Sequence, residues 1–199
     1  MTWAPDYAET AELRDYLRIG DNADNTFIDL WITTVSRNVD DHCHRQFGQV
    51  TSAEDRYYPP VYDRHECAWM VEIDDLQDTT GFTLTDADGT AIPVKTSTVA
   101  GYTLLPRNAA AKGRPYERLK ITSNPGAEVT GNGLWGWSAQ PSAVKTGLFL
   151  QGARLAARRD SPFGISGSPS EQGEIRLLAQ LDPDFKTSLK PLVRKWWVR

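Results

Sequence analysis

The sequence predicts an α+β fold in which a core of helices carries an inserted small antiparallel β-subdomain and an extended C-terminal tail. Three observations predict it. Apolar residues recur at helical spacing before Gly48, short strand-like runs between turn residues fill residues 50–137, and helical spacing returns after Pro141. We therefore divide the chain into N-terminal helices (1–49), a β-subdomain (50–137), C-terminal helices (138–182) and a tail (183–199).

The composition indicates one folded domain with an appendage. The 199 residues are 40% hydrophobic and 24% charged, which supplies enough apolar area for a core and excludes a disordered chain. No apolar run approaches the roughly 20 residues that span a bilayer, and the N-terminus lacks a signal-peptide pattern. Two cysteines cannot build a disulfide framework. We expect a soluble protein without a membrane partner.

The N-terminal residues predict two helices. Asp6 and Glu9 have the spacing of a capping box ahead of a short helix that ends at Gly20. After an acidic opening, apolar residues recur every four positions along a helix of about six turns. This predicted apolar stripe consists of Phe27, Trp31, Val35, Val39 and Cys43, and Ile28 and Leu30 widen it.

The middle of the chain predicts a β-subdomain of six short strands. Turn sequences such as Asp88-Gly89 and Asn124-Pro125-Gly126 separate the strands and favour antiparallel pairing. We place the strands at 57–58, 68–73, 82–85, 102–105, 119–122 and 133–137.

Two more helices are predicted after the strands. One spans about 141–159 with Pro141 in its first turn, and a last one starts at a capping box at 168–171 and ends before Pro183. The first of them has a face of small residues, which permits close approach of another helix from this chain or from a neighbour. That face consists of Gly147, Gly152, Ala153, Ala156 and Ala157.

The net charge of −4 hides two ends of opposite sign. Residues 1–55 carry 11 acidic and 4 basic side chains, whereas residues 183–199 carry 5 basic side chains and one acid. An acidic body is a poor general binder of nucleic acid. The tail ends in a basic and aromatic cluster made of Arg194, Lys195, Trp196, Trp197 and Arg199. Such residues anchor protein interfaces, so we favour docking on a partner over packing back onto the core.

Histidine and cysteine form the only arrangement that resembles a metal site. The candidates are His42, Cys43 and His44 in the long helix and His65 and Cys67 before a strand. Neighbours two apart on a helix point about 200° apart, Cys43 lies on the apolar stripe, and the spacing of known zinc motifs is absent. We predict no metal and no cofactor.

The sequence carries no strong catalytic motif. It lacks a nucleophile elbow, a P-loop and a dinucleotide-binding glycine fingerprint. Two acidic pairs, Asp40-Asp41 and Asp74-Asp75, have the chemistry for acid–base work or Mg²⁺ binding, but such pairs are typical of a solvated acidic surface. No catalytic residues are assigned and an enzyme is not expected. One group of basic residues has two possible interpretations, as a contact for phosphate or as a solvated hairpin loop. It consists of Arg107, Lys112, Arg114, Arg118 and Lys120.

Several stretches together resemble one family. They are Thr10–Leu17, Cys43–Gly48, Tyr102–Pro106, Trp135-Gly136-Trp137 leading into Pro141, and the helix end Ala157–Gly164. In this order they look like the head-tail connector, or adaptor, proteins of long-tailed bacteriophages, most closely those of actinobacteriophages. The large β-subdomain departs from simpler connectors, which are mostly helical with a shorter hairpin.

The resemblance implies a structural virion protein. Members form a commonly dodecameric ring of identical subunits beneath the portal protein, joining capsid to tail at the virion neck after synthesis in the bacterial cytoplasm. It implies contacts with portal, with stopper or tail proteins and with further copies of the chain. Genomic DNA would pass through the lumen without sequence-specific binding. The tail would reach the portal through Trp196 and Trp197, with Arg194, Lys195 and Arg199 paired to portal acids. The alternatives are a stopper or tail-terminator ring and, third, a zinc-dependent or nuclease-like enzyme.

Overall fold

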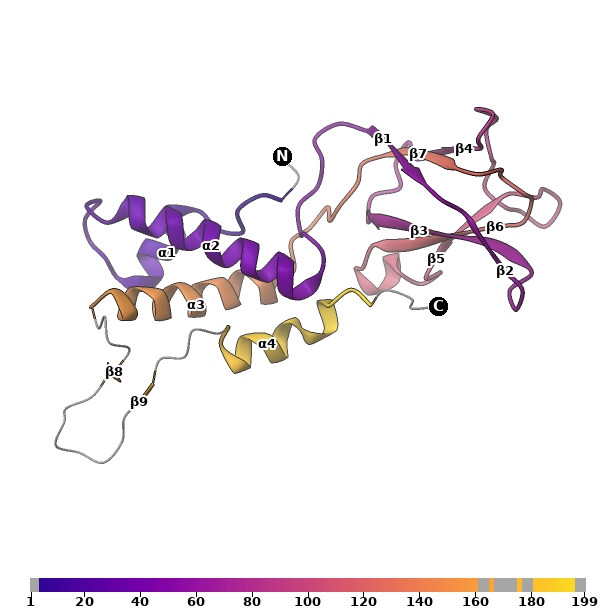
Figure 1. Cartoon of the computed structure of the whole chain (residues 1–199). Helices are drawn as coiled ribbons and strands as arrows, with labels where there is room; N and C mark the ends of the chain where they lie inside the picture. The colour runs from indigo at the N-terminus through magenta and orange to yellow at the C-terminus, as the bar shows by residue number, and fades with distance from the viewer. Residues whose placement is uncertain (1–3, 161–164, 167–174, 177–180, 196–199) are drawn as a thin grey trace. The chain divides into compact units, whose positions relative to one another are not determined.

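The computed structural model describes residues 4–160, 165–166, 175–176 and 181–195. The chain divides into two compact units. The β unit comprises Gly48–Ala139, and the helical unit comprises Ala4–Phe47 together with the chain from Gln140 onward. Each unit is formed by its own set of elements, coloured by residue number in Figure 1.

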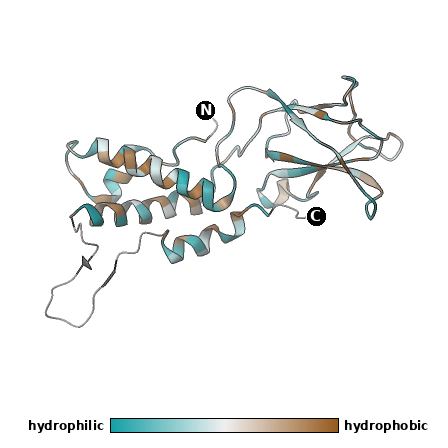
Figure 2. Cartoon of the chain, viewed as in Figure 1, coloured by the Kyte–Doolittle hydropathy of each residue, from teal (hydrophilic) through white to brown (hydrophobic). Residues whose placement is uncertain are grey.

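The helical unit is arranged around one long helix. Helix α3 (Ser142–Asp160) contacts α1 (Thr10–Leu17), α2 (Asn25–Cys43) and α4 (Pro183–Leu189). A 3₁₀ turn, Lys190–Leu192, follows α4. Hydrophobic residues recur along α2 (Figure 2), and Ile28, Ile32, Val35, Val39 and Cys43 are the ones that are buried.

The first two helices begin and end through backbone and side-chain caps. A capping box joins Glu9 and Glu12 at the start of α1. The sequence predicted this box three positions earlier, at Asp6 and Glu9. The Asp6 carboxylate instead accepts a hydrogen bond from the Thr33 hydroxyl. Helix α1 ends at Arg18 and α2 ends at His44, both in the left-handed conformation that closes a helix.

Helices α3 and α4 pack closely because α3 has glycine at the contact. A Cβ on Gly147 would lie 1.8 Å from two carbons of the Phe185 ring, so only glycine admits that ring. Phe185 and Leu189, one turn apart on α4, are both fully buried. Asp182 caps α4 by accepting hydrogen bonds from the backbone N–H groups of Asp184 and Phe185.

The β unit contains two antiparallel sheets. The three-stranded sheet has the order β1-β7-β4 and the four-stranded sheet the order β2-β3-β6-β5. The strands are β1 (Glu54–Tyr58), β2 (Val61–Asp63), β3 (Ala68–Leu76), β4 (Thr83–Thr85), β5 (Tyr102–Leu105), β6 (Tyr116–Ile121) and β7 (Val129–Gly133). Only Pro59-Pro60 separates β1 from β2, so one short stretch of chain supplies an edge strand to each sheet.

Both sheets contribute to one apolar core. Val71 and Leu119 from the four-stranded sheet and Leu84 and Val129 from the three-stranded sheet are no more than 1% exposed. Trp135, which follows β7, is fully buried and forms edge-to-face contacts with Tyr58 and with Phe82. The β unit therefore has a hydrophobic core of its own.

The chain enters and leaves the β unit through a short backbone ladder. Val50 N–H donates to the Trp135 carbonyl at 2.9 Å, and Trp137 N–H donates to the Gly48 carbonyl at 2.8 Å. Between the two tryptophans, Gly136 has φ +112°, and a Cβ there would lie 2.0 Å from the Gly48 carbonyl oxygen. Glycine is therefore required for the two segments to come this close.

The predicted fold class is wrong in its architecture. The chain is α+β, but it is not a helical core with a small β insertion, because residues 48–139 fold into two sheets around their own core. Seven strands form these sheets; β2 was not predicted, and β7 lies at 129–133 rather than 133–137. The glycines of β7 resemble a turn in sequence, yet the rings of Phe82 and Trp135 cover them and make this the central strand.

The predicted extended tail is also wrong. Residues 183–192 are helical and pack on α3, because Asp182 caps α4 and Phe185 fits against Gly147. The helix predicted at about 168–181 is wrong at Ile175–Arg176, which pairs as strand β9 with β8 (Ile165–Ser166). The capping box predicted at 168–171 lies outside the described residues.

Substitution of Gly136 tests the ladder. We expect Gly136→Ala to lower the free energy of unfolding by about 3 kcal/mol or more, because a Cβ adds a backbone clash to an unfavourable positive φ. Gly89→Ala is the matched control, since Gly89 has φ +80° and a Cβ added there would meet no atom within 4 Å. It should cost about 1 kcal/mol. Urea denaturation measures both, and equal losses would contradict the steric argument.

Candidate assembly surfaces

The predicted docking tail begins inside the helical unit. Arg194 is 7% exposed, and its backbone N–H donates to the Cys43 carbonyl oxygen at 2.8 Å. Lys195 is exposed, while Trp196, Trp197 and Arg199 lie outside the described residues. The start of the tail thus lies at the C-terminal end of α2, and Arg194 is buried there rather than presented to a partner.

The small-residue face of α3 is partly used within the chain. A Cβ on Gly152 would lie 2.9 Å from a methyl carbon of Leu13, so α1 occupies that position. Ala153 and Ala156 are half-buried and Ala157 is exposed. These alanines remain accessible to a further helix.

The histidine and cysteine candidates are divided between the two units. Cys43 is buried in the helical unit, and burial raises the pKa of its thiol to about 12. Burial, with the nearby Lys186 and His44, lowers the pKa of His42. His65 and Cys67 are exposed in the β unit, before β3. Across the part of the chain that the structure describes, no three His, Cys, Asp or Glu side chains gather as metal ligands would.

The acidic pair Asp74-Asp75 does not converge either. Asp74 and Asp75 are successive residues of β3, so they point to opposite faces of the sheet. Asp74 faces Arg56 and Tyr58, whereas Asp75 accepts a hydrogen bond from Trp137 Nε1 at 2.7 Å and is 3% exposed. Each carboxylate is occupied by a structural contact.

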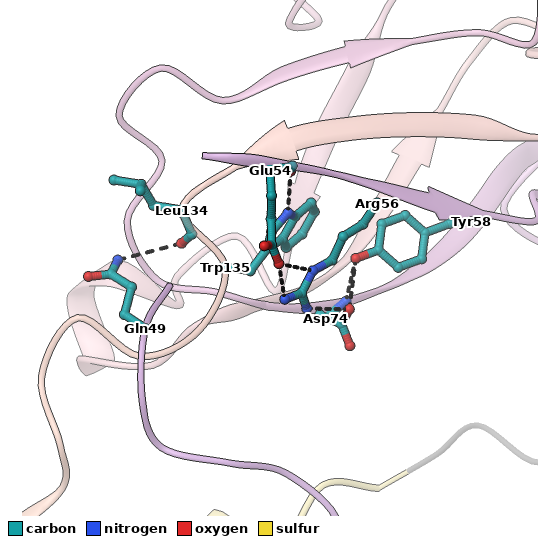
Figure 3. A network of polar contacts seen from close by, with 7 residues as sticks. All are labelled: Gln49, Glu54, Arg56, Tyr58, Asp74, Leu134 and Trp135. Atoms are coloured by element: carbon teal, nitrogen blue, oxygen red, sulfur yellow. Dashed lines mark hydrogen bonds and ion pairs between the residues drawn. The ribbon is translucent and has the colours of Figure 1, made fainter. Parts of the chain in front are cut away.

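A polar network around Arg56 connects the two sheets of the β unit (Figure 3). The guanidinium nitrogens of Arg56 on β1 lie 2.5 Å from a carboxylate oxygen of Glu54 and 2.7 Å from Asp74 Oδ2 on β3. The Tyr58 hydroxyl donates to the same Asp74 oxygen at 3.0 Å. Burial lowers the pKa of Arg56, but hydrogen bonds with the two carboxylates outweigh it, and the pKa lies above its usual value. The guanidinium also lies over the Trp135 ring, 5.4 Å from its centre. The sequence offers no motif for this network.

An exposed apolar patch lies on α2. We define the α2 patch as Phe27, Leu30 and Trp31; Phe27 is 50% and Leu30 60% exposed, and Trp31 is half-buried. Arg159 of α3 lies 5.7 Å from the centre of the Phe27 ring and 5.8 Å from that of Trp31, and pairs with Asp24 at 2.7 Å. The sequence placed Phe27 and Trp31 on the apolar stripe, and the structure corrects this assignment.

A second apolar area involves α1 and α3. Tyr16, 47% exposed, stacks on Phe149 with ring centres 5.3 Å apart, and Leu150 beside it is 39% exposed. Exposed side chains of this size are uncommon as a group on a monomer that functions alone. The helical unit therefore exposes large apolar side chains on α1, α2 and α3.

A buried polar contact fixes the N-terminal segment to α2. The Tyr7 hydroxyl donates to an Asp40 carboxylate oxygen and accepts from Phe47 N–H at 2.8 Å. Arg37 lies 3.2 Å from the second Asp40 oxygen. Burial raises the pKa of Asp40 to about 6, although Tyr7 and Arg37 favour the charged form. The stability of the helical unit is therefore coupled to the protonation of Asp40.

Comparison with protein-family models and with curated proteins gives no match for this chain. Among the described residues, no helix is both long enough and apolar enough to cross a bilayer.

Asp40 should give the stability a specific pH dependence. Its pKa in the folded state lies above the unfolded value of about 3.9, so between roughly pH 4 and 6 the folded state binds more protons. Stability from this group is full below pH 4 and is lost as the pH rises through 6. Relative to Asp40→Asn, which cannot titrate, the wild-type unfolding free energy should fall by about 2 kcal/mol from pH 4 to 7. Urea denaturation across this range measures it.

The control is Asp15→Asn on the exposed surface of α1. Its pH profile should run parallel to the wild-type profile. Parallel profiles for wild type and Asp40→Asn would contradict the attribution of this pH dependence to Asp40.

Proposed function

We propose that this protein is a head-to-tail connector, or adaptor, of a long-tailed bacteriophage. In this proposal it is a structural virion protein of the neck, with no enzymatic activity, that forms a ring beneath the portal and leaves a channel for DNA. The ring binds portal on one side and stopper or tail proteins on the other. The sequence supports this proposal through several stretches that resemble connector proteins and follow in the same order.

The observation that carries the proposal is the apolar surface of the helical unit. Phe27 and Leu30 are half or more exposed on a helix whose opposite side is packed, and Tyr16 and Leu150 form a second exposed apolar area. A ring of identical subunits needs two different contact faces on each subunit. We assign the α2 patch to one face and the accessible alanines of α3, Ala156 and Ala157, to the other.

The tail keeps its proposed role in portal binding, with a revised composition. Arg194 is buried, so Lys195 and Arg199 are the cations proposed to meet portal acids. Trp196 and Trp197 are the proposed hydrophobic anchors, in keeping with the frequency of tryptophan among interface anchors. Truncations that remove α4 cannot test this role, because Phe185 and Leu189 belong to the core.

A stopper or tail-terminator ring is the second candidate. The observation that favours it is the independent core of the β unit, which also exposes Val61 and Val99 by 43% and 44%. In such a ring, contacts through the β unit would dominate assembly. The two candidates therefore differ in which unit carries the assembly contacts.

Paired substitutions distinguish these candidates. We expect Phe27→Glu/Leu30→Glu to abolish ring formation on purified portal while changing the unfolding free energy by less than about 1 kcal/mol, because both side chains are exposed. Val61→Glu/Val99→Glu makes the same kind of change in the β unit and should leave the ring intact. Native mass spectrometry with portal measures both. Loss of assembly in the β-unit variant alone would favour the stopper or terminator ring.

Substitution in the tail tests portal binding separately. We expect Trp196→Ala/Trp197→Ala to weaken binding to portal by at least about 2 kcal/mol, the size typical of interface anchors. Sedimentation velocity of the protein with and without portal measures the loss. The variant should unfold at the same urea concentration as wild type. Unchanged binding would remove the tail from the proposal.

A further inference from the structure

Residues 93–121 are the basic region of an acidic chain. They carry six basic side chains and one acid, Glu117, while the chain as a whole has a net charge of −4. The region includes β5, β6 and the loop that precedes β5. Lys120 pairs with Glu66 at 2.7 Å, so the cations of this region that lack such a pair are the ones that attract partners of the opposite sign.

A hollow of about 540 Å³ lies within this region. Its volume falls in the range of about 300–1,000 Å³ that is typical of ligand sites. The lining combines two cations, Lys95 and Arg107, with apolar and hydroxyl groups. The lining also includes Thr96, Tyr102 and Leu104. Within the described part of the chain neither Lys95 nor Arg107 has an ion-pair partner, so both charges are available.

The outer edge of β5 is covered at one end only. Tyr102 N–H donates to the Pro93 carbonyl at 2.9 Å and Lys95 N–H donates to the Tyr102 carbonyl at 2.8 Å, so the segment 93–95 runs beside the start of β5. The chain then leaves the strand, because Thr96 Oγ1 accepts from the N–H groups of Thr98 and Val99 in a tight turn. The hollow begins where this segment departs.

The register of β5 leaves Leu104 with an open backbone. Leu104 lies opposite Leu119 of β6, and hydrogen-bonded pairs alternate along an antiparallel ladder. Because Tyr102 makes its backbone hydrogen bonds on the outer side, Leu104, two residues on, also points its N–H and carbonyl outward. No described residue pairs with them. An open edge of this kind is a template for another strand.

We propose that the open edge of β5 and the adjoining hollow form a docking site for an extended, acidic peptide segment of a partner protein. The segment pairs with Leu104 as an added strand and places carboxylates against Lys95 and Arg107. Strand addition takes its affinity from the main chain and its specificity from alternate side chains. The phosphates of a nucleic acid could also pair with Lys95 and Arg107. A nucleic acid has no peptide backbone, however, and cannot pair as a strand with the N–H and carbonyl of Leu104. This proposal is independent of the connector function.

A peptide titration of the full chain tests the proposal without portal. The probe is a peptide of about nine residues that alternates glutamate and valine, followed by amide chemical shifts at low salt. We expect saturable shifts at Leu104 and at residues 94–97. A peptide that alternates lysine and valine should not bind. The same acidic peptide with its central backbone nitrogens methylated should also fail, because it cannot pair with a strand edge.

Charge reversal locates the site. Lys95→Glu/Arg107→Glu should weaken peptide binding by about five-fold or more. Lys112→Glu/Arg114→Glu is the matched control, because it makes the same charge change on exposed residues outside the hollow and should alter binding by less than about two-fold. Circular dichroism checks that both variants fold.

Three results would overturn the proposal. They are an absence of saturable shifts, equal binding of the N-methylated peptide, or tighter binding of a single-stranded oligothymidine at the same residues. The last would assign the hollow to nucleic acid instead.

Discussion

The backbone ladder where the chain enters and leaves the β unit is the constraint on which the rest of the structure depends. Hydrogen bonds between Gly48 and Trp137 and between Val50 and Trp135 bring together two points of the chain that are almost ninety residues apart. The helical segments before and after the β unit are thereby returned to one another, and α2 and α3 can pack in one unit. Gly136 permits the close approach, Trp135 fills the β core, and Trp137 contacts Asp75. The aromatic-glycine-aromatic motif found in the sequence thus has three separate structural tasks.

Sequence patterns predicted the long helices and several short strands well, including β4 and β5, but missed β2 and α4. Helices α2 and α3 have enough turns for their pattern to stand out, whereas β2 has three residues and α4 has seven. The signal for α4 was present in Asp182-Pro183 with Phe185 and Leu189 one turn apart, but Pro183 was interpreted as the end of a preceding helix. Strand β7 was displaced because its glycines resemble a turn. Their role depends on the rings of Phe82 and Trp135, which approach only in the folded chain.

The predicted stripe on α2 is confirmed at Val35, Val39 and Cys43 and wrong at Phe27 and Trp31, for a geometric reason. Residues spaced by four advance about 40° around a helix with each step, so Phe27 and Cys43, four steps apart, point in nearly opposite directions. The packed side follows Ile28, Ile32, Val35, Val39 and Cys43, which mix spacings of three and four and so stay on one side of the helix. Burial of Arg194 and exposure of Phe27 likewise reflect tertiary contacts that a linear pattern does not contain. The sequence shows where the tail, the α3 alanines and the basic residues of 107–120 lie along the chain. It does not show which of them are accessible to solvent.

The two prolines between β1 and β2 have a mechanical consequence. Strand β1 belongs to the three-stranded sheet and strand β2 to the four-stranded sheet, and only two residues join them. The sheets also share the Arg56 network and a single apolar core. Neither sheet can open alone without pulling on the edge of the other, so local fluctuations that would fray an isolated sheet are suppressed. The two sheets of the β unit should therefore open together, as one cooperative unit.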